Sequence, residues 1–141
     1  MKTPFLLLAA TALLLAGCAT QPQSGNAALM NRFKQADASG DGKLSRKEFT
    51  DFLIAEAFAN YDTNKDGFVT LEEWTAGGGS RETFLAMGGR SGKLTLAQVQ
   101  SSKIAQNQMA IPFDSADTSK TGYLTFDEFV AYRAAAAPYV R

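Results

Sequence analysis

The sequence predicts an all-α protein of about five to six helices that surround a repeated loop. A twelve-residue pattern of acidic, polar and glycine residues occurs at 62–73, 37–48 and 117–128, and a degenerate copy occurs at 87–98. An apolar pair spaced three residues apart precedes each acidic copy, and an aromatic residue follows it. This spacing is typical of one helix entering the loop and another leaving it. The chain is therefore predicted to be an internal repeat of helix-loop-helix units.

The first seventeen residues are predicted to be a targeting segment outside the fold. Behind Lys2 runs an apolar stretch, residues 5–16, that is too short to span a bilayer comfortably. The stretch ends in Leu-Ala-Gly-Cys, residues 15–18, which resembles the bacterial lipobox. That resemblance implies cleavage before Cys18 and lipid attachment to it. An ordinary signal peptide with an incidental cysteine is the alternative.

Lipidation at Cys18 would make a membrane one partner of the protein and place it in the bacterial cell envelope. Because Ala19 rather than aspartate follows the cysteine, the resemblance favours the outer membrane, facing the periplasm, in a Gram-negative host. Residues 18–26 are polar and turn-prone, which predicts a flexible tether. Residues 27–141 are the predicted domain, and their number suits one compact unit.

Composition excludes several classes of function. The formal net charge of the chain is zero, so nucleic-acid binding is not predicted. The sequence contains no histidine, which removes His-dependent catalysis and the usual zinc sites. Its single cysteine allows no intramolecular disulfide. No nucleophile–base pair and no phosphate loop occur, so the protein is predicted not to be an enzyme.

The loop at 62–73 is the most complete copy of the repeat. It has oxygen-bearing side chains at positions 1, 3, 5 and 9, glycine at 6, valine at 8 and glutamate at 12. An ordinary surface turn needs neither Val69 nor Glu73, and the whole pattern resembles the calcium-binding loop of the EF-hand family. The resemblance implies a Ca²⁺ site and a short β-bridge to a partner loop. The implied ligands are Asp62, Asn64, Asp66, the backbone carbonyl of Phe68, Thr70 and Glu73.

The loop at 37–48 resembles the same family and is predicted to be a second calcium site. It has serine at position 3, where the family prefers an acid or an amide, and basic residues surround it. These features should weaken binding somewhat. The implied ligands are Asp37, Ser39, Asp41, the backbone carbonyl of Lys43, Ser45 and Glu48.

The loop at 117–128 is a weaker candidate for calcium. Only its first and last positions carry a negative charge among the expected ligands, because Thr121 stands where an acid is usual. It either binds with reduced affinity or stays empty and serves packing. The candidate ligands are Asp117, Ser119, Thr121, the backbone carbonyl of Tyr123, and Glu128.

The loop at 87–98 keeps the frame of the repeat without its carboxylates. Met87, Gly89 and Gln98 occupy positions 1, 3 and 12. We expect no calcium here and a structural role as partner of another loop.

The helix between the first two loops is predicted to serve both. Residues 49–61 contain no breaker and are apolar on two faces, one beginning at Phe49 and the other at Ile54. Loops 37–48 and 62–73 should then lie at opposite ends of this helix and not pair directly.

Further helices are predicted downstream of the second loop. The glycine run 77–79 breaks the chain, and Ser80 can cap a short helix after it. One helix is predicted over 94–110, and Pro112 suits the first turn of the helix that enters loop 117–128. The last helix is predicted over 126–137.

Two arrangements of the loops remain open. In one, loop 37–48 pairs with loop 87–98, and loop 62–73 pairs with loop 117–128. In the other, the glycine run lets loops 62–73 and 87–98 fold together.

Two roles for calcium also remain open. The protein is either a sensor or adaptor that exposes apolar surface to an unidentified protein partner, or a structural or buffering protein in which calcium is a permanent ion. The candidate groove residues either line a partner site or, for most of them, form a closed core. These residues are Met30, Phe52, Leu53, Ile54, Phe84, Leu85, Met87 and Met109.

Overall fold

The computed structural model describes residues 24–136, so the predicted signal peptide, Cys18 and most of the tether lie outside the described residues. Within them about two thirds of the residues are helical and the strands are short, which confirms the predicted fold class. The elements are α1 Ser24–Ala36, β1 Leu44–Ser45, α2 Arg46–Tyr61, β2 Phe68–Thr70, α3 Leu71–Ala76, α4 Arg81–Ala86, the 3₁₀ turn η1 Gly89–Ser91, β3 Lys93–Thr95, α5 Leu96–Ser101, α6 Lys103–Ala116, β4 Tyr123–Leu124 and α7 Phe126–Ala136. Among residues 24–136, no helix has the length and hydrophobicity needed to cross a membrane.

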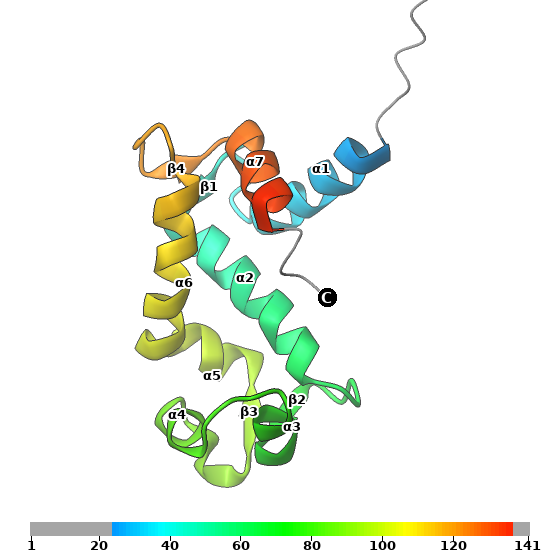
Figure 1. Ribbon diagram of the computed structural model, residues 1–141, viewed down its shortest axis with the longest axis vertical. Coiled ribbons are helices and arrows are strands. Elements are labelled where there is room, and N and C mark those ends of the chain that lie inside the picture. Colours follow the sequence, from blue (N-terminus) through cyan, green and yellow to red (C-terminus); the bar gives the residue numbers. More distant parts are fainter. Residues whose placement is uncertain (1–23, 137–141) are drawn as a thin grey trace, which may run out of the picture.

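The four loops form two pairs at opposite ends of the molecule (Figure 1). In the upper pair, loops 37–48 and 117–128 are joined by antiparallel β1 and β4. In the lower pair, loops 62–73 and 87–98 are joined by antiparallel β2 and β3. The register sets the apolar position-8 residues opposite each other, Leu44 with Leu124 and Val69 with Leu94.

The pairing settles the two arrangements left open by the sequence. Loops 62–73 and 87–98 do fold together, and the arrangement that joined 37–48 to 87–98 and 62–73 to 117–128 is wrong. The physical reason is the short connection between the lower loops. Helices α3 and α4 have six residues each, and the chain reverses between them at the glycine run 77–79, where Gly78 has φ +90°.

Helix α2 serves both pairs, as the sequence predicted. Its sixteen residues begin directly after β1 and end directly before Asp62, so it connects the upper pair to the lower pair (Figure 1). At 1.5 Å per residue it is about 24 Å long. The two predicted faces pack into different cores, with Phe49 and Leu53 in the upper core and Ile54 in the lower one.

Each pair encloses its own apolar core. The upper core is dominated by phenylalanine, and its buried members are Phe33, Ala36, Leu44, Phe49, Leu53, Phe113, Ala116, Leu124 and Phe129. The lower core is mostly aliphatic, and its buried members are Ile54, Val69, Phe84, Met87, Leu94 and Ala105. Half-buried Met109 packs against both cores.

Three sequence predictions about helix boundaries need correction. The predicted helix over 94–110 is two helices, because Ser102 adopts an extended backbone (φ −73°, ψ 122°) between α5 and α6. Pro112 lies inside α6 rather than in its first turn, because α6 already begins at Lys103. Helix α1 begins at Ser24, so the last three residues of the predicted tether are helical. With these divisions residues 24–136 contain seven α-helices rather than five to six.

Candidate metal centres

The backbone of each acidic loop turns sharply at two positions. At position 6 a glycine has positive φ in all three loops, for example +84° at Gly67. At position 4 the backbone is also left-handed, with φ +72° at Gly40, +58° at Lys65 and +57° at Lys120. A non-glycine residue in this region is strained, so Lys65 and Lys120 are held there by the rest of the loop. This requirement at position 4 was not predicted from the sequence.

The aspartate at position 1 anchors the loop through backbone amides. In loop 62–73 the residue Asp62 is only 8% exposed, and its carboxylate accepts hydrogen bonds from the amides of Asp66 (3.1 Å) and Gly67 (3.0 Å). Asp37 and Asp117 make the same bond to the position-6 amide, each at 2.9 Å. These donors fix a negative charge at the start of each loop.

The glutamate at position 12 joins the two ends of the loop. One oxygen of Glu73 accepts the amides of Thr63 (3.2 Å) and Asn64 (3.3 Å) at the start of the loop. The other accepts the amide (3.0 Å) and hydroxyl (2.9 Å) of Thr70, which caps α3. The hydrogen bonds from Thr70 are the main reason that the pKa of Glu73 falls to about 2. Glu73 is therefore ionised at neutral pH.

The other two glutamates at position 12 are held in the same way. Burial raises the pKa of Glu48, but hydrogen bonds from Ser45 and Ser39 outweigh it and lower the pKa to about 2. The amide of Thr125 is the main cause of the drop in the pKa of Glu128, also to about 2. All three loops therefore present a charged oxygen pair at position 12.

The donor set of loop 62–73 fits a calcium ion. Within residues 24–136, no three acidic side chains gather closely enough to hold a metal ion by themselves. Calcium does not require such a cluster, because it takes six to eight oxygens of mixed type from one loop. Loop 62–73 supplies three carboxylates, together with the side-chain amide of Asn64, the hydroxyl of Thr70 and the carbonyl of Phe68. Every predicted ligand of this site thus lies on one loop whose shape is fixed by its own amides.

Loop 37–48 keeps the same frame with a poorer position 3. The hydroxyl of Ser39 donates to the carboxylate of Asp37 at 3.2 Å, so its proton points toward the first ligand. The basic side chain of Lys43, which we expected to weaken the site, extends over the ring of Tyr123 in the partner loop, with 4.2 Å from Nζ to the centroid. The ammonium group of Lys43 is thereby attracted to the face of this ring.

In loop 117–128, two of the candidate ligands are hydrogen-bonded to each other. The hydroxyl of Thr121 donates to the backbone carbonyl of Tyr123 at 3.1 Å. A calcium ion would have to share this carbonyl with the hydroxyl proton. The structure thus gives a reason for weak binding beyond the missing charge at position 5.

Loop 87–98 uses an amide where the others use a carboxylate. The Gln98 side-chain oxygen accepts the amide (2.9 Å) and hydroxyl (3.0 Å) of Thr95, as Glu73 does with Thr70. Its nitrogen donates to the carbonyl of Gly88 at 3.4 Å. Met87 at position 1 is 6% exposed and packs in the lower core. The loop is therefore closed by its own side chains, which agrees with the predicted structural role.

A lysine over an aromatic ring recurs in both pairs at position 7. In the upper pair Lys43 lies over Tyr123, and in the lower pair Lys93 lies over Phe68 with 4.8 Å from Nζ to the centroid. Each contact crosses between partner loops and adds a link beside the short β-bridge. These contacts were not predicted from the sequence, although the lysine in one loop and the aromatic residue at the same position of its partner were a usable signal.

Comparison with known proteins agrees with this geometry. A family model described as an EF-hand domain pair matches residues 51–134, and one described as an EF hand matches residues 30–53. Reticulocalbin-3 from Homo sapiens is 40% identical over 57 residues, which cover 32% of this chain and 17% of that protein. Polcalcin Ole e 3 from Olea europaea is 40% identical over 53 residues, which cover 30% of this chain and 63% of that protein. The chain thus spans less than two thirds of the length of either relative.

The paired helix-loop-helix units and their oxygen-rich loops define a calcium-binding protein. Because the domain-pair match covers more than half of the sequence, the chain belongs to the EF-hand family.

Proposed function

We propose that this protein is a calcium sensor or adaptor, anchored by a lipid at Cys18 to the bacterial cell envelope, that binds Ca²⁺ at loops 62–73 and 37–48. Loop 117–128 is a weaker third site. The function is binding and not catalysis, and its readout is a contact with a protein partner. We place the protein on the outer membrane, facing the periplasm.

The observation that carries the calcium proposal is that Glu73 accepts hydrogen bonds from both ends of its loop. Its two oxygens hold the start and the end of loop 62–73, through the amides of Thr63 and Thr70 (3.2 and 3.0 Å). If Glu73 moves when an ion binds, both ends of the loop move with it, and so do the adjoining helices α2 and α3. Because Glu73 is ionised at neutral pH, no proton has to leave before the ion binds.

A cavity beside loop 62–73 supports the sensor role. It has a volume of about 170 Å³, and apolar side chains of both lower loops and of α2 and α6 line it, among them Val69, Trp74, Met87 and Met109. Val69 is on the β-bridge, and Trp74 directly follows Glu73. A change at the ion site therefore reaches the cavity wall through adjacent residues.

The second role, a calcium-stabilised structural or buffering protein, is favoured by a different observation. Four of the eight candidate groove residues, Leu53, Ile54, Phe84 and Met87, are at most 8% exposed. Only Leu85 among the eight is a large exposed apolar residue, at 36%. A closed core of this kind needs no switch to be useful, because a bound ion stabilises it directly.

The site assignment is tested with the chain that begins at residue 18, carrying Cys18→Ser. Calcium is titrated while the emission of Trp74, the only tryptophan, is followed. Glu73→Gln should weaken binding roughly tenfold or more, because it removes charge from a ligand (tenfold is about 1.4 kcal/mol). Glu72→Gln is the matched control, since the neighbouring side chain is exposed and lies outside the predicted ligand set. Equal effects of the two substitutions would contradict the site assignment.

The two roles are separated by an apolar dye in the same titration. A sensor should bind more dye as calcium rises, because filled loops would open the cavity in the lower pair. In a structural protein, calcium should raise the melting temperature without increasing dye binding. Dye binding that does not change between chelator and saturating calcium would contradict the sensor proposal.

The anchor is tested separately in cells. Cys18→Ser should abolish incorporation of labelled palmitate and release the protein from the membrane fraction. Retention in that fraction after the substitution would contradict the lipid anchor and leave the calcium sites untouched.

A further inference from the structure

The two loop pairs are connected only through helices among residues 24–136. Strand β1 pairs with β4 and β2 with β3, so no β-bridge links the upper pair to the lower pair. Helix α2 leaves loop 37–48 and enters loop 62–73. In the opposite direction, α5 leaves loop 87–98, and α6 enters loop 117–128. Any influence of one pair on the other must therefore pass through α2, α5 and α6.

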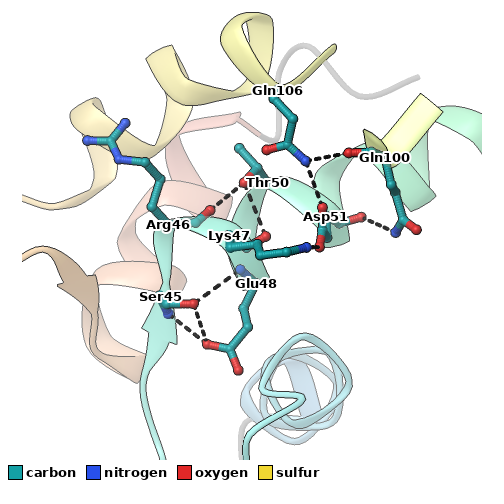
Figure 2. Close-up of polar contacts among 8 residues, drawn as sticks. All are labelled: Ser45, Arg46, Lys47, Glu48, Thr50, Asp51, Gln100 and Gln106. Carbon is teal, nitrogen blue, oxygen red and sulfur yellow. Dashed lines mark hydrogen bonds and ion pairs between the residues drawn. The ribbon is translucent and has the colours of Figure 1, made fainter. Parts of the chain in front are cut away.

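A polar network joins these helices close to loop 37–48 (Figure 2). Its centre is Asp51, three residues after the predicted ligand Glu48 on α2, with a side chain only 23% exposed. One oxygen of Asp51 accepts the side-chain amide of Gln106 on α6 at 2.9 Å. Its backbone carbonyl accepts the side-chain amide of Gln100 on α5 at 3.3 Å. Its other oxygen pairs with Lys47, one turn earlier on α2.

The same network holds the bend between α5 and α6. Gln106 also donates to the backbone carbonyl of Gln100 at 2.7 Å, across the extended residue Ser102. That carbonyl is in the last turn of α5, where the helix has no following backbone amide that could donate to it. Asp51 thus orients the side chain that closes the bend, and it sets the direction of α5 relative to α2.

We propose that Asp51, with Gln100 and Gln106, couples calcium binding at loop 37–48 to calcium binding at loop 62–73. The proposal rests on the proposed function, because it requires ions at both loops. Asp51 is a positioning residue and touches no ion. When Glu48 binds calcium, the first turn of α2 shifts, and Asp51 carries that shift to α5.

The lower loop receives the shift through its partner. Helix α5 begins directly after β3, and β3 is paired with β2 along Phe68, Val69 and Thr70 of the loop that binds. A change in the direction of α5 therefore alters the backbone that carries the Thr70 ligand and the Phe68 carbonyl. The degenerate loop 87–98 acts in this scheme as a mechanical link, since Gln98 keeps it closed without an ion.

The coupling is tested by a mutant cycle read by Trp74 in the lower pair, using calcium alone as the probe. In the parent chain, Glu48→Gln should weaken the Trp74-reported affinity about fivefold, the lower end of typical coupling between sites. In the Asp51→Ala background the same substitution should change that affinity less than about 1.5-fold, because the coupling has been removed. Asp51→Asn keeps an oxygen acceptor for Gln106 and should preserve the fivefold effect.

Gln106→Ala repeats the test without touching α2 and should also abolish the effect, so the cycle remains usable if Asp51→Ala does not fold. Asn107→Ala is the matched control on the exposed side of α6 and should leave the fivefold effect intact. The proposal is overturned if Glu48→Gln has no effect in the parent chain, or if its full effect persists in the Asp51→Ala or Gln106→Ala background. A Trp74 titration that ignores Glu73→Gln would instead overturn the lower site itself, and the coupling with it.

Discussion

The upper and lower pairs have the same loop architecture but differ in their ligand residues and in the residues of their cores. In the upper pair both loops keep aspartate at position 1 and glutamate at position 12, and the core is largely phenylalanine. In the lower pair one loop is complete, the other has no carboxylate at any ligand position, and a cavity borders the core. Both pairs nevertheless have an antiparallel β-bridge and a lysine–aromatic contact between their loops. The comparison teaches that the frame of a loop is encoded separately from its ability to hold an ion.

The residue that separates frame from ion is the one at position 12. Glutamate and glutamine both accept the amide and the hydroxyl of position 9, as Glu73 and Gln98 do from Thr70 and Thr95. Those two bonds cap the following helix and so preserve the fold. Only glutamate adds the negative charge that an ion requires.

The largest expected effect concerns the cores. Phe129→Ala in the upper pair removes a ring that packs against Phe33, Phe49 and Phe52, and it should lower the free energy of unfolding by about 3–5 kcal/mol. Because α2 belongs to both cores, the urea midpoint seen by Trp74 in the lower pair should fall together with that seen by far-UV circular dichroism. Two separated transitions would show that the pairs unfold independently.

Removal of calcium from a single loop should have the next largest effect. At a free calcium concentration of one hundred times Kd, each occupied loop adds about 2.7 kcal/mol to the free energy of unfolding. A chelator should therefore lower the melting temperature in calorimetry, and Glu73→Gln should remove the part that comes from the lower pair. If the chelator leaves the melting temperature unchanged, the loops are not occupied in the folded state under those conditions.

The weak loop of the upper pair should be repairable by one residue. Thr121→Asp replaces a hydroxyl that donates to the Tyr123 carbonyl with a carboxylate, and it should raise affinity roughly tenfold, or about 1.4 kcal/mol. Isothermal titration in a chain carrying Glu48→Gln and Glu73→Gln isolates this loop. Gln98→Glu, the corresponding single change in the lower pair, should create no site, because Met87 and Gly89 offer no side-chain oxygen. Calcium binding by that variant would mean that position 12 alone decides.

The smallest expected effect concerns the contact beside the lower β-bridge. Lys93→Gln removes the cation from the ring of Phe68 and should cost about 0.5–1 kcal/mol of unfolding free energy, as for other exposed cation–π pairs. Lys34→Gln, at an exposed position on α1, is the control for loss of one positive charge. A double-mutant cycle with Phe68→Leu isolates the contact, and a coupling energy of zero would refute it.

Local features of this molecule could be predicted from the sequence. Every predicted ligand of a loop lies within twelve residues, so order along the chain is enough to place it. The shared helix was predictable because residues 49–61 contain no breaker, and its two apolar faces do enter two cores. These features depend on short-range geometry.

The features that were predicted wrongly or missed depend on contacts far apart in the sequence. The bend at Ser102 has no glycine or proline to announce it, and it is held by bonds from α5 and α6 to Asp51, about fifty residues away. The wrong prediction for Pro112 followed from this missed bend. Because a new helix, α6, begins at Lys103, Pro112 lies in its interior and not in its first turn. Loop pairing likewise depended on how tightly the chain reverses at the glycine run 77–79.

The inward-facing Met87 links the missing carboxylate at position 1 of loop 87–98 to the packing of the lower core. A variant designed to bind calcium at this loop would need new oxygens at residues 87 and 89 and a carboxylate at residue 98. A carboxylate at residue 87 would have to turn toward the loop amides, as Asp62 does, and would leave the place in the lower core where Met87 is now 6% exposed. The first substitution therefore removes apolar packing from the lower core before any ion can bind. The division of labour between the two loops of the lower pair is thus preserved by packing, whether or not calcium is present.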